Sequence, residues 1–342
     1  IYTLSLHDAL PISDKKVLIL SDGKMGHQNQ SLRLVQSLGI KNFDVLKLDR
    51  RLCGKVLSFI YPKLIVKNLK ELNCVFKKGE YDIVVGIGSV PRLAMVSLKK
   101  QNPNLKTICI MDPKRNYSSY DVIALPTHDN VSYSGDNIVR FTGSLSYFNA
   151  NDLNIAKEEF KDEFSSIIGN PLIGLVIGGD SKGYKFNMLK AHDLLDKTFI
   201  LANKLGSHIY ATTSRRTPQV VVDYIKYRLE KSDNTIYTSG DKNPYRAIMA
   251  YSSIIIVTPE TVSMLMESCA TDALVLISDR HSVKSSRIQF FIKELMGKGL
   301  LFDLDDMLND DDISSYILKA GESASFDELE KVVEFIKLKK II

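Results

Sequence analysis

The sequence is poor in cysteine, in charge of one sign and in long apolar runs, and each shortage excludes a class of protein. Its four cysteines lie far apart and form no CxxC pair, which argues against a disulfide framework and favours a reducing compartment. The 45 Lys and Arg residues and 40 Asp and Glu residues give a net charge of +5, too little for a dedicated nucleic-acid-binding protein. No stretch reaches the roughly 18 uninterrupted apolar residues of a membrane span. We expect neither a metal site nor a nucleic-acid partner.

The first 13 residues differ from the rest of the chain. They contain no Lys or Arg, and His7 and Asp8 interrupt their apolar residues, so they do not have the pattern of a signal peptide. The string from Thr3 to Ile12 resembles one reading frame of a common short-read sequencing adapter. We therefore interpret residues 1–13 as a non-native, adapter-derived segment.

The remaining chain alternates short apolar runs with longer segments of helical period. With 44% hydrophobic and 25% charged residues in 342, it is long enough for two folded domains. The predicted buried strands are Val17–Leu20, Phe43–Leu48, Ile83–Ile87, Thr107–Met111, Val122–Ala124, Ile138–Phe141, Leu172–Ile177, His208–Ala211, Thr235–Tyr237, Ile254–Val257 and Ala273–Ile277. The predicted helices are Gln28–Leu38, Pro91–Lys100, Asn187–Leu205, Pro218–Glu230 and Val262–Cys269. This alternation predicts an α/β fold with parallel sheets in two Rossmann-like halves.

The predicted boundaries follow from this alternation. Residues 14–160 form the first half and residues 161–325 the second. Residues 326–342 carry apolar side chains at helical spacing and fit a closing amphipathic helix.

In open parallel sheets, ligands bind beyond the carboxyl ends of the strands, so the loops that follow the strands should carry the chemistry. The first such loop spans Ser21–Ser31, and Asp22 and His27 are its candidates for proton transfer. It lacks the GxGxxG and GxxxxGK[ST] fingerprints. The simpler alternative is a glycine-containing turn with a helix cap. The other residues expected on this side of the site are Gly23, Lys24, Gly26, Gln28, Asn29, Gly88, Ser89, Arg92 and His128.

Three loops in the second half have residues suited to a phosphate. Gly178–Lys182 combines glycines with one point charge, and Thr212–Pro218 combines hydroxyls with two guanidiniums that match phosphate oxygens. In Thr258–Glu267, Ser263 and Glu267 share one helical face. Helix capping is the alternative for this last loop. The predicted donor-binding residues are Gly178, Gly179, Asp180, Ser181, Lys182, Thr213, Ser214, Arg215, Arg216, Glu260, Thr261, Ser263 and Glu267.

At these loops the chain resembles the bacterial branch of the mitochondrial-fission "elongate mitochondria" family, which is glycosyltransferase-like. The resemblance rests on SDGKMGHQNQS (21–31), MDP (111–113), LPTHD (125–129), GGDSK (178–182), TTSRRTP (212–218) and TPETVSMLMESCAT (258–271). It implies a GT-B architecture of two facing Rossmann-like domains, with a nucleotide-sugar mainly on the C-terminal domain and the acceptor mainly on the N-terminal one. The family's usual Asp-Ser pair is Glu260-Thr261 here.

A basic segment occupies residues 50–78. It holds eight Lys and Arg residues against one Glu, a net charge of +7, with aromatic and aliphatic residues between them. Such a segment suits docking on an anionic membrane surface. The alternative is a solvated helix packed through its apolar face.

The leading hypothesis is a GT-B glycosyltransferase that moves a sugar from a nucleotide-sugar to a lipid or polysaccharide acceptor of the cell envelope, with no obligatory cofactor or metal. Asp22 or His27 would be the base, and Glu267 would bind ribose or sugar hydroxyls. We expect a cytoplasmic protein, peripheral on the inner face of the cytoplasmic membrane. The alternative is a non-catalytic, membrane-associated scaffold that recruits a partner. An NAD-dependent epimerase is disfavoured because GxGxxG and a Tyr-x-x-x-Lys pair are missing from the expected places.

Overall fold

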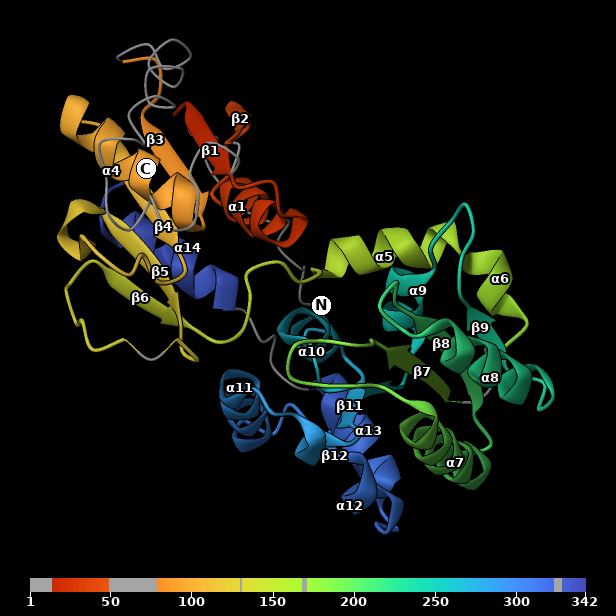
Figure 1. Cartoon of the computed structure of the whole chain (residues 1–342). Coiled ribbons are helices and arrows are strands. Elements are labelled where there is room, and N and C mark those ends of the chain that lie inside the picture. The colour runs from red at the N-terminus through yellow and green to blue at the C-terminus, as the bar shows by residue number, and fades with distance from the viewer. Residues whose placement is uncertain (1–13, 49–78, 130, 168–170, 323–327) are drawn as a thin grey trace, which may run out of the picture. The chain divides into compact units, whose positions relative to one another are not determined.

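The computed structural model describes residues 14–48, 79–129, 131–167, 171–322 and 328–342 (Figure 1). The chain divides into two compact units, one of Ile1–Ser146 with Asp327–Ile342 and the other of Tyr147–Phe326. This division precedes the predicted boundary at 160/161, because α5 (Ala150–Glu159) packs against α9 (Tyr245–Tyr251) of the second unit. The predictions for residues 1–13 and 50–78 lie outside the described residues.

The first unit is built on a parallel sheet with the strand order β2-β1-β3-β4-β5-β6. The strands are β1 (Val17–Ser21), β2 (Phe43–Lys47), β3 (Ile83–Ile87), β4 (Lys106–Ile110), β5 (Val122–Pro126) and β6 (Ile138–Phe141). β1, β3 and β5 are buried along their whole length, as in parallel sheets that are covered on both faces. The prediction that Phe43–Leu48 is a buried strand is wrong about burial: β2 is largely exposed, and in the described ranges it lies at the edge of the sheet beside β1 alone.

Within the described residues of the first unit, three helices contact this sheet. α1 (Met25–Ser37) contacts β1 and β3, and α4 (Ser89–Gln101) contacts β3 and β4. The C-terminal α14 (Glu328–Leu338) contacts β6 and α1 (Figure 1). It buries Leu329, Val332, Val333 and Ile336. The closing amphipathic helix is therefore present, and it returns the end of the chain to the first unit.

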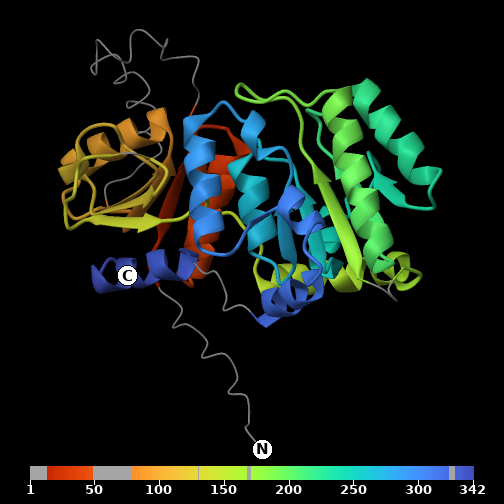
Figure 2. The ribbon, with the colours of Figure 1, turned by 90° about the horizontal axis from the view of Figure 1, so that it is seen from below.

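The second unit is built on another parallel sheet, with the order β12-β11-β10-β7-β8-β9. The strands are β7 (Leu172–Ile177), β8 (His208–Thr213), β9 (Thr235–Tyr237), β10 (Ile254–Val257), β11 (Leu274–Ile277) and β12 (Phe302–Asp303). The helices besides α5 and α9 are α6 (Lys161–Ser165), α7 (Met188–Leu205), α8 (Gln219–Glu230), α10 (Val262–Cys269), α11 (Ser286–Gly297), α12 (Leu304–Leu308) and α13 (Ile313–Glu322). The helices predicted at α7, α8 and α10 are confirmed, and α7 packs against α8 (Figure 2).

Local sequence explains where α7 begins and ends. The side chain of Asn187 accepts the backbone N–H of Lys190 at 3.1 Å and so caps the first turn. Gly206 ends the helix in the left-handed conformation, with φ of 62°, which glycine adopts at little cost.

The strand order reverses once in each sheet. β1 lies between β2 and β3, and β7 lies between β8 and β10, so the chain leaves each of these strands toward one side and later resumes on the other. A crevice at the carboxyl ends of the strands is expected at such a switch point, and ligands bind there in open α/β sheets. The two switch points therefore fix where each unit should carry its chemistry. None of the helices in the described ranges is both long and apolar enough to cross a bilayer.

Candidate functional site

The first switch point joins the two predicted proton-transfer residues. Asp22 directly follows β1, and its side chain is 0% exposed. Both of its carboxylate oxygens lie 3.1 Å from Nδ1 of His27, in the first turn of α1. The backbone N–H of Lys24 donates to the same carboxylate at 3.2 Å. Asp22 can therefore hold the ring in one orientation. The imidazole is 21% exposed, so a substrate can reach it to exchange a proton.

Gly88 brings the next loop against this pair. It precedes α4, with φ of 102°, a conformation that side chains with a Cβ rarely adopt. A Cβ at this position would lie 2.7 Å from Oδ2 of Asp22 and 3.4 Å from Nδ1 of His27. The neighbouring strands β1 and β3 thus place Gly88 beside the Asp22–His27 pair. Ser89 and Arg92 follow in the first turn of α4, both accessible to solvent.

The other residues predicted for the acceptor side lie at varying distances from this pair. Nζ of Lys24 is 3.7 Å from Oδ2 of Asp22, and the Gln28 amide accepts the Ser21 hydroxyl at 3.0 Å. Gly23, Gly26 and Asn29 are exposed in the same loop and first turn. His128 is buried after β5, which β4 separates from β3. It is thus the predicted residue that the topology places farthest from the pair along the sheet.

At the second switch point, the loops after β7, β8 and β10 interlock. The N–H of Gly178 donates to the Thr258 hydroxyl at 2.8 Å, and the N–H of Gly179 donates to Oε1 of Glu260 at 2.9 Å. A Cβ at residue 179 would overlap the backbone of Arg216. The two glycines therefore allow close approach of neighbouring loops. Contrary to the expectation of a phosphate-facing turn, both N–H groups are already used by the protein.

The remainder of the Gly178–Lys182 loop is also held internally. The Asp180 carboxylate accepts Nζ of Lys185 at 2.7 Å and the N–H of Phe186 at 3.1 Å. The bond to Lys185 holds the pKa of Asp180 below its usual value. The N–H of Ser181 donates to the carbonyl of Tyr184 at 2.9 Å. Only the side chain of Lys182, which is exposed, has the character of a phosphate ligand in this loop.

The loop after β8 places the guanidinium of Arg216 at the start of α10. The guanidinium of Arg216 is exposed and donates to the hydroxyl of Thr261 at 2.9 Å. Thr261 is the N-cap residue of α10, and no described side chain caps this helix. The N–H groups of its first turn have no acceptor within the helix. A free helix N-terminus with a guanidinium beside it is suited to bind an anion. Arg215, on the same loop as Arg216, and Lys182, on the loop after β7, are also exposed.

The shape of the loop after β8 comes from its own hydroxyls. Ser214 accepts the N–H of Arg216 at 3.1 Å and donates its N–H to the Thr217 hydroxyl, also at 3.1 Å. The Thr217 hydroxyl in turn bonds the carbonyl of Gly178. Thr213 ends β8 just before them. Ser214 therefore helps to shape the loop that carries the two arginines.

Farther along α10, Glu267 lies in a largely desolvated position. Burial raises the pKa of its carboxyl to about 7, although the hydroxyl of Tyr245 and the charge of Arg246 oppose the shift. Tyr245 donates to Oε2 of Glu267 at 2.6 Å. Ser263, one turn earlier on α10, is half-buried. Tyr245 is absent from the predicted residues, because nothing in the sequence around it indicates that α9 lies beside α10.

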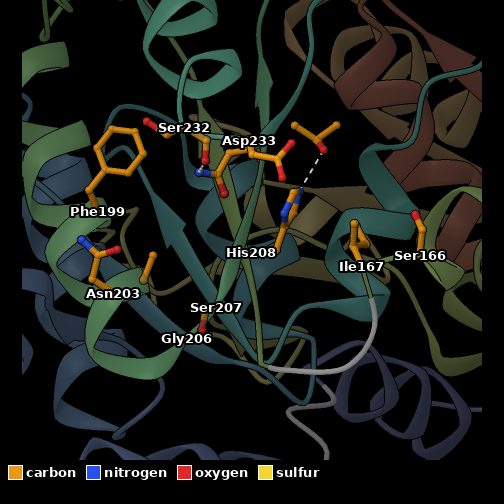
Figure 3. Close-up of a pocket in the computed structure, with 12 residues that line it drawn as sticks. Ser166, Ile167, Phe199, Asn203, Gly206, Ser207, His208, Ser232 and Asp233 are labelled. Atoms are coloured by element: carbon orange, nitrogen blue, oxygen red, sulfur yellow. Dashed lines mark hydrogen bonds between the residues drawn. The ribbon is translucent and has the colours of Figure 1, made fainter.

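A separate hollow of about 790 Å³ lies at the opposite end of the second sheet (Figure 3). It is lined by His208 and Thr235, at the amino ends of β8 and β9, and by Phe199 and Asn203 of α7. The ring Nε2 of His208 is 2.9 Å from the Thr235 hydroxyl, and burial lowers the pKa of His208. None of the predicted residues lines this hollow. Among the described residues, no group of three or more His, Cys, Asp or Glu residues is placed to hold a metal ion.

Sequence comparison finds a family model that matches residues 25–332, and its description is mitochondrial fission ELM1. A relative in Rickettsia prowazekii (strain Madrid E), an uncharacterized protein named RP120, is 24% identical over 361 aligned positions. The alignment covers 94% of this chain and 97% of the relative.

Solved structures match the whole fold at low identity. A UDP-GlcNAc 2-epimerase from Neisseria meningitidis, bound to UDP-GlcNAc, superposes with a TM-score of 0.61 at 14% identity, covering 95% of this chain and 99% of that one. MurG from Acinetobacter baumannii superposes with a TM-score of 0.51 at 14% identity, with the same coverage of 95% and 99%. The predicted fold class is confirmed: two α/β units of the GT-B type, each with a six-stranded parallel sheet.

Proposed function

Since the chain belongs to the mitochondrial fission ELM1 family and has a GT-B fold, we propose that it transfers a sugar from a nucleotide-sugar to a cell-envelope acceptor. One observation carries the proposal. At the switch point of the second sheet, the guanidinium of Arg216 lies 2.9 Å from Thr261, at the uncapped N-terminus of α10. A diphosphate is an anion that this combination of cation and helix N-terminus suits.

In this proposal the second unit binds the donor. Arg215, Arg216 and the first N–H groups of α10 hold the diphosphate, with Lys182 as a further charge. As the sugar leaves, negative charge develops on the diphosphate, and fixed cations stabilise it. These groups take the part that a metal ion plays in other transferases, so no cofactor is required. Glu267 accepts hydrogen bonds from ribose hydroxyls.

The first unit supplies the base. His27 accepts the proton of the acceptor hydroxyl as that oxygen bonds to the sugar carbon and the bond between the sugar and the diphosphate breaks. Asp22 holds Nδ1 of the ring, so the proton is taken by Nε2. Gly88, Ser89 and Arg92 adjoin this pair and contribute to the acceptor side. Asp22 is thereby a positioning residue, and His27 is the catalytic one.

The acceptor we propose is a lipid or a polysaccharide of the cell envelope. The proposal is supported by the charge of residues 50–78, eight basic residues against one acid. Each base adds about 1 kcal/mol of attraction near an anionic membrane surface. We accordingly propose a cytoplasmic location, peripheral on the inner face of the cytoplasmic membrane.

A thermal-shift screen tests the donor proposal, because a ligand that binds the folded state raises the melting temperature. The panel holds UDP-GlcNAc, UDP-glucose, GDP-mannose, ADP-glucose and a CMP-sugar. We expect one of them to raise the melting temperature of the wild-type chain and to have no effect on Arg215→Ala/Arg216→Ala. The control is Lys226→Ala, at an exposed position of α8, which should respond like wild type.

Product analysis with the same ligand separates the alternatives. Release of a free nucleotide with sugar on an added acceptor supports transfer. An isomerised nucleotide-sugar without transfer indicates an epimerase. No binding of any panel member by a folded chain contradicts the proposal and favours the non-catalytic scaffold.

A further inference from the structure

Glu260 is a buried carboxylate that the proposed reaction leaves unused. It lies directly before Thr261 at the second switch point and is 3% exposed. Its Oε1 accepts the N–H of Gly179 at 2.9 Å and lies 3.4 Å from the Thr261 hydroxyl. Its Oε2 is buried, and no hydrogen-bond donor in the described part of the chain reaches it. Leaving a buried acceptor unpaired costs stability, and the cost is larger for a charged group, so such a group calls for an explanation.

The backbone is adapted to hold this carboxylate in place. A Cβ at residue 178 would overlap Oε1 of Glu260, so only a glycine there leaves room for the side chain. The N–H of Gly178 is satisfied by Thr258 at 2.8 Å, which leaves the carboxylate to Gly179. Oε1 of Glu260 is therefore enclosed by Gly178, the N–H of Gly179 and the hydroxyl of Thr261. Oε2 has no donor among the described residues.

The surroundings of Glu260 indicate what kind of partner is missing. The guanidinium of Arg216 bonds Thr261 at 2.9 Å, and the Thr261 hydroxyl is next to Oε1 of Glu260. The carboxylate thus adjoins the cation that holds the diphosphate in our proposal. A carboxylate oxygen accepts hydrogen bonds, so the missing partner is a donor, and a hydroxyl group supplies one without placing a further negative charge against Glu260. The partner that fits is a neutral donor attached to the phosphates.

We infer that Oε2 of Glu260 accepts a hydrogen bond from a hydroxyl group of the donor substrate, adjacent to its diphosphate. The inference rests on the proposed function. Ribose and the transferred sugar both carry such hydroxyls. Glu260 then acts as a specificity residue: it selects a diphosphate that is joined to a polyol over the bare anion, because an analogue without the hydroxyl leaves the buried oxygen unpaired.

Calorimetry with three ligands tests the inference on the wild-type chain and Glu260→Gln. The ligands are inorganic pyrophosphate, the nucleoside diphosphate and the nucleotide-sugar of one base, beginning with UDP and UDP-GlcNAc. Glutamine keeps an oxygen for the N–H of Gly179 but replaces the second acceptor with an NH₂ donor. We expect at least about a tenfold loss of affinity for UDP-GlcNAc, with the affinity for pyrophosphate unchanged or higher. An equal loss with UDP identifies ribose as the source of the hydroxyl, and a loss confined to UDP-GlcNAc identifies the sugar.

The control is Thr258→Val, which removes the acceptor of the Gly178 N–H and leaves Glu260 in place. It should weaken the three ligands alike or not at all. If Glu260→Gln behaves in the same way, Glu260 has a structural role only and the inference is overturned. If Glu260→Gln does not fold, deoxy analogues of the ligand on the wild-type chain take its place, and equal affinity for analogue and parent overturns the inference. A folded wild-type chain that binds no nucleotide-sugar contradicts the proposed function itself.

Discussion

The two switch points of this chain hold buried carboxylates that are used in different ways. Asp22 follows β1 and Glu260 follows β10, and both are close to fully buried. Each fits because a glycine follows the neighbouring strand, Gly88 for Asp22 and Gly178 for Glu260. The packing condition is the same in both sheets although the strands are exchanged: the carboxylate follows the switch strand β1 in the first sheet, whereas the glycine follows the switch strand β7 in the second.

The difference lies in the partners. Both oxygens of Asp22 face the ring of His27, and a backbone N–H adds to them. Glu260 uses one oxygen within the protein, and its other oxygen meets no donor among the described residues. A buried carboxylate is stable only with partners. Asp22 finds them within the protein, whereas in our proposal a ligand supplies the missing partner of Glu260.

The largest effect is expected from breaking the complete pair. His27→Ala and Asp22→Asn should each lower the rate of sugar transfer by about 10²–10⁴-fold, the usual contribution of a general base. Donor affinity measured by calorimetry should stay within about twofold of wild type, because both residues belong to the first unit. His192→Ala, an exposed histidine of α7, is the control. If His27→Ala kept full transfer activity, His27 would not be the general base.

An intermediate effect, on the free energy of unfolding, is expected when Gly88 or Gly178 is replaced by alanine. Gly88→Ala forces a Cβ to within 2.7 Å of Asp22 at a positive φ, and Gly178→Ala displaces the Glu260 carboxylate. Each should lower the free energy of unfolding by about 1–3 kcal/mol, from backbone strain or overpacking. Denaturant unfolding measures the change. Gly297→Ala, with no atom within 4 Å of the added Cβ, should change stability by less than about 1 kcal/mol. Similar values for all three variants would contradict the packing argument.

The smallest effect is a pH dependence of donor binding. Burial raises the pKa of Glu267 to about 7, so part of the free protein is protonated there at neutral pH. Ribose hydroxyls favour the ionised form, which lowers this pKa in the complex and releases a proton on binding. A fall of about one unit would make affinity about fivefold higher at pH 8 than at pH 6. Calorimetry in two buffers measures the proton release.

Glu267→Gln should lose this part of the pH dependence and keep only that of the ligand's own phosphates. The folding stability of the wild-type chain should depend on pH in the opposite direction to its donor affinity: it should fall as pH rises. The carboxyl of Glu267 has a raised pKa in the folded state, so its ionisation destabilises the wild-type chain as pH rises above the unfolded value of about 4.5. The variant should therefore gain stability relative to wild type between about pH 5 and pH 8. A wild-type affinity that is independent of pH after phosphate correction would argue against hydroxyls at Glu267.

The sequence predicts the parts of these sites that depend on neighbours along the chain. Asp22 and His27 belong to one loop, and the helix at Val262–Cys269 is found at its predicted bounds. It does not predict contacts between distant loops. The N–H groups of Gly178 and Gly179 are taken by Thr258 and Glu260, which lie some 80 residues farther along the chain. Only the strand order reveals that β10 is next to β7.

The same limit explains two other differences. β2 has the apolar residues of a buried strand but pairs with one strand among the described residues, and three of its five residues are exposed. Tyr245 bonds Glu267 from α9, and nothing in the local sequence of either helix indicates that they pack together. Burial and pairing of this kind are set by tertiary topology, which composition and periodicity do not specify.

The most direct test of a donor site completed by its ligand is an experimental structure of this chain with the nucleotide-sugar that binds it. We expect the diphosphate at Arg216 and the first turn of α10, with a ligand hydroxyl within hydrogen-bond distance of Oε2 of Glu260. A ligand found elsewhere, such as in the hollow beside His208, with the loops after β7, β8 and β10 unoccupied, would contradict it.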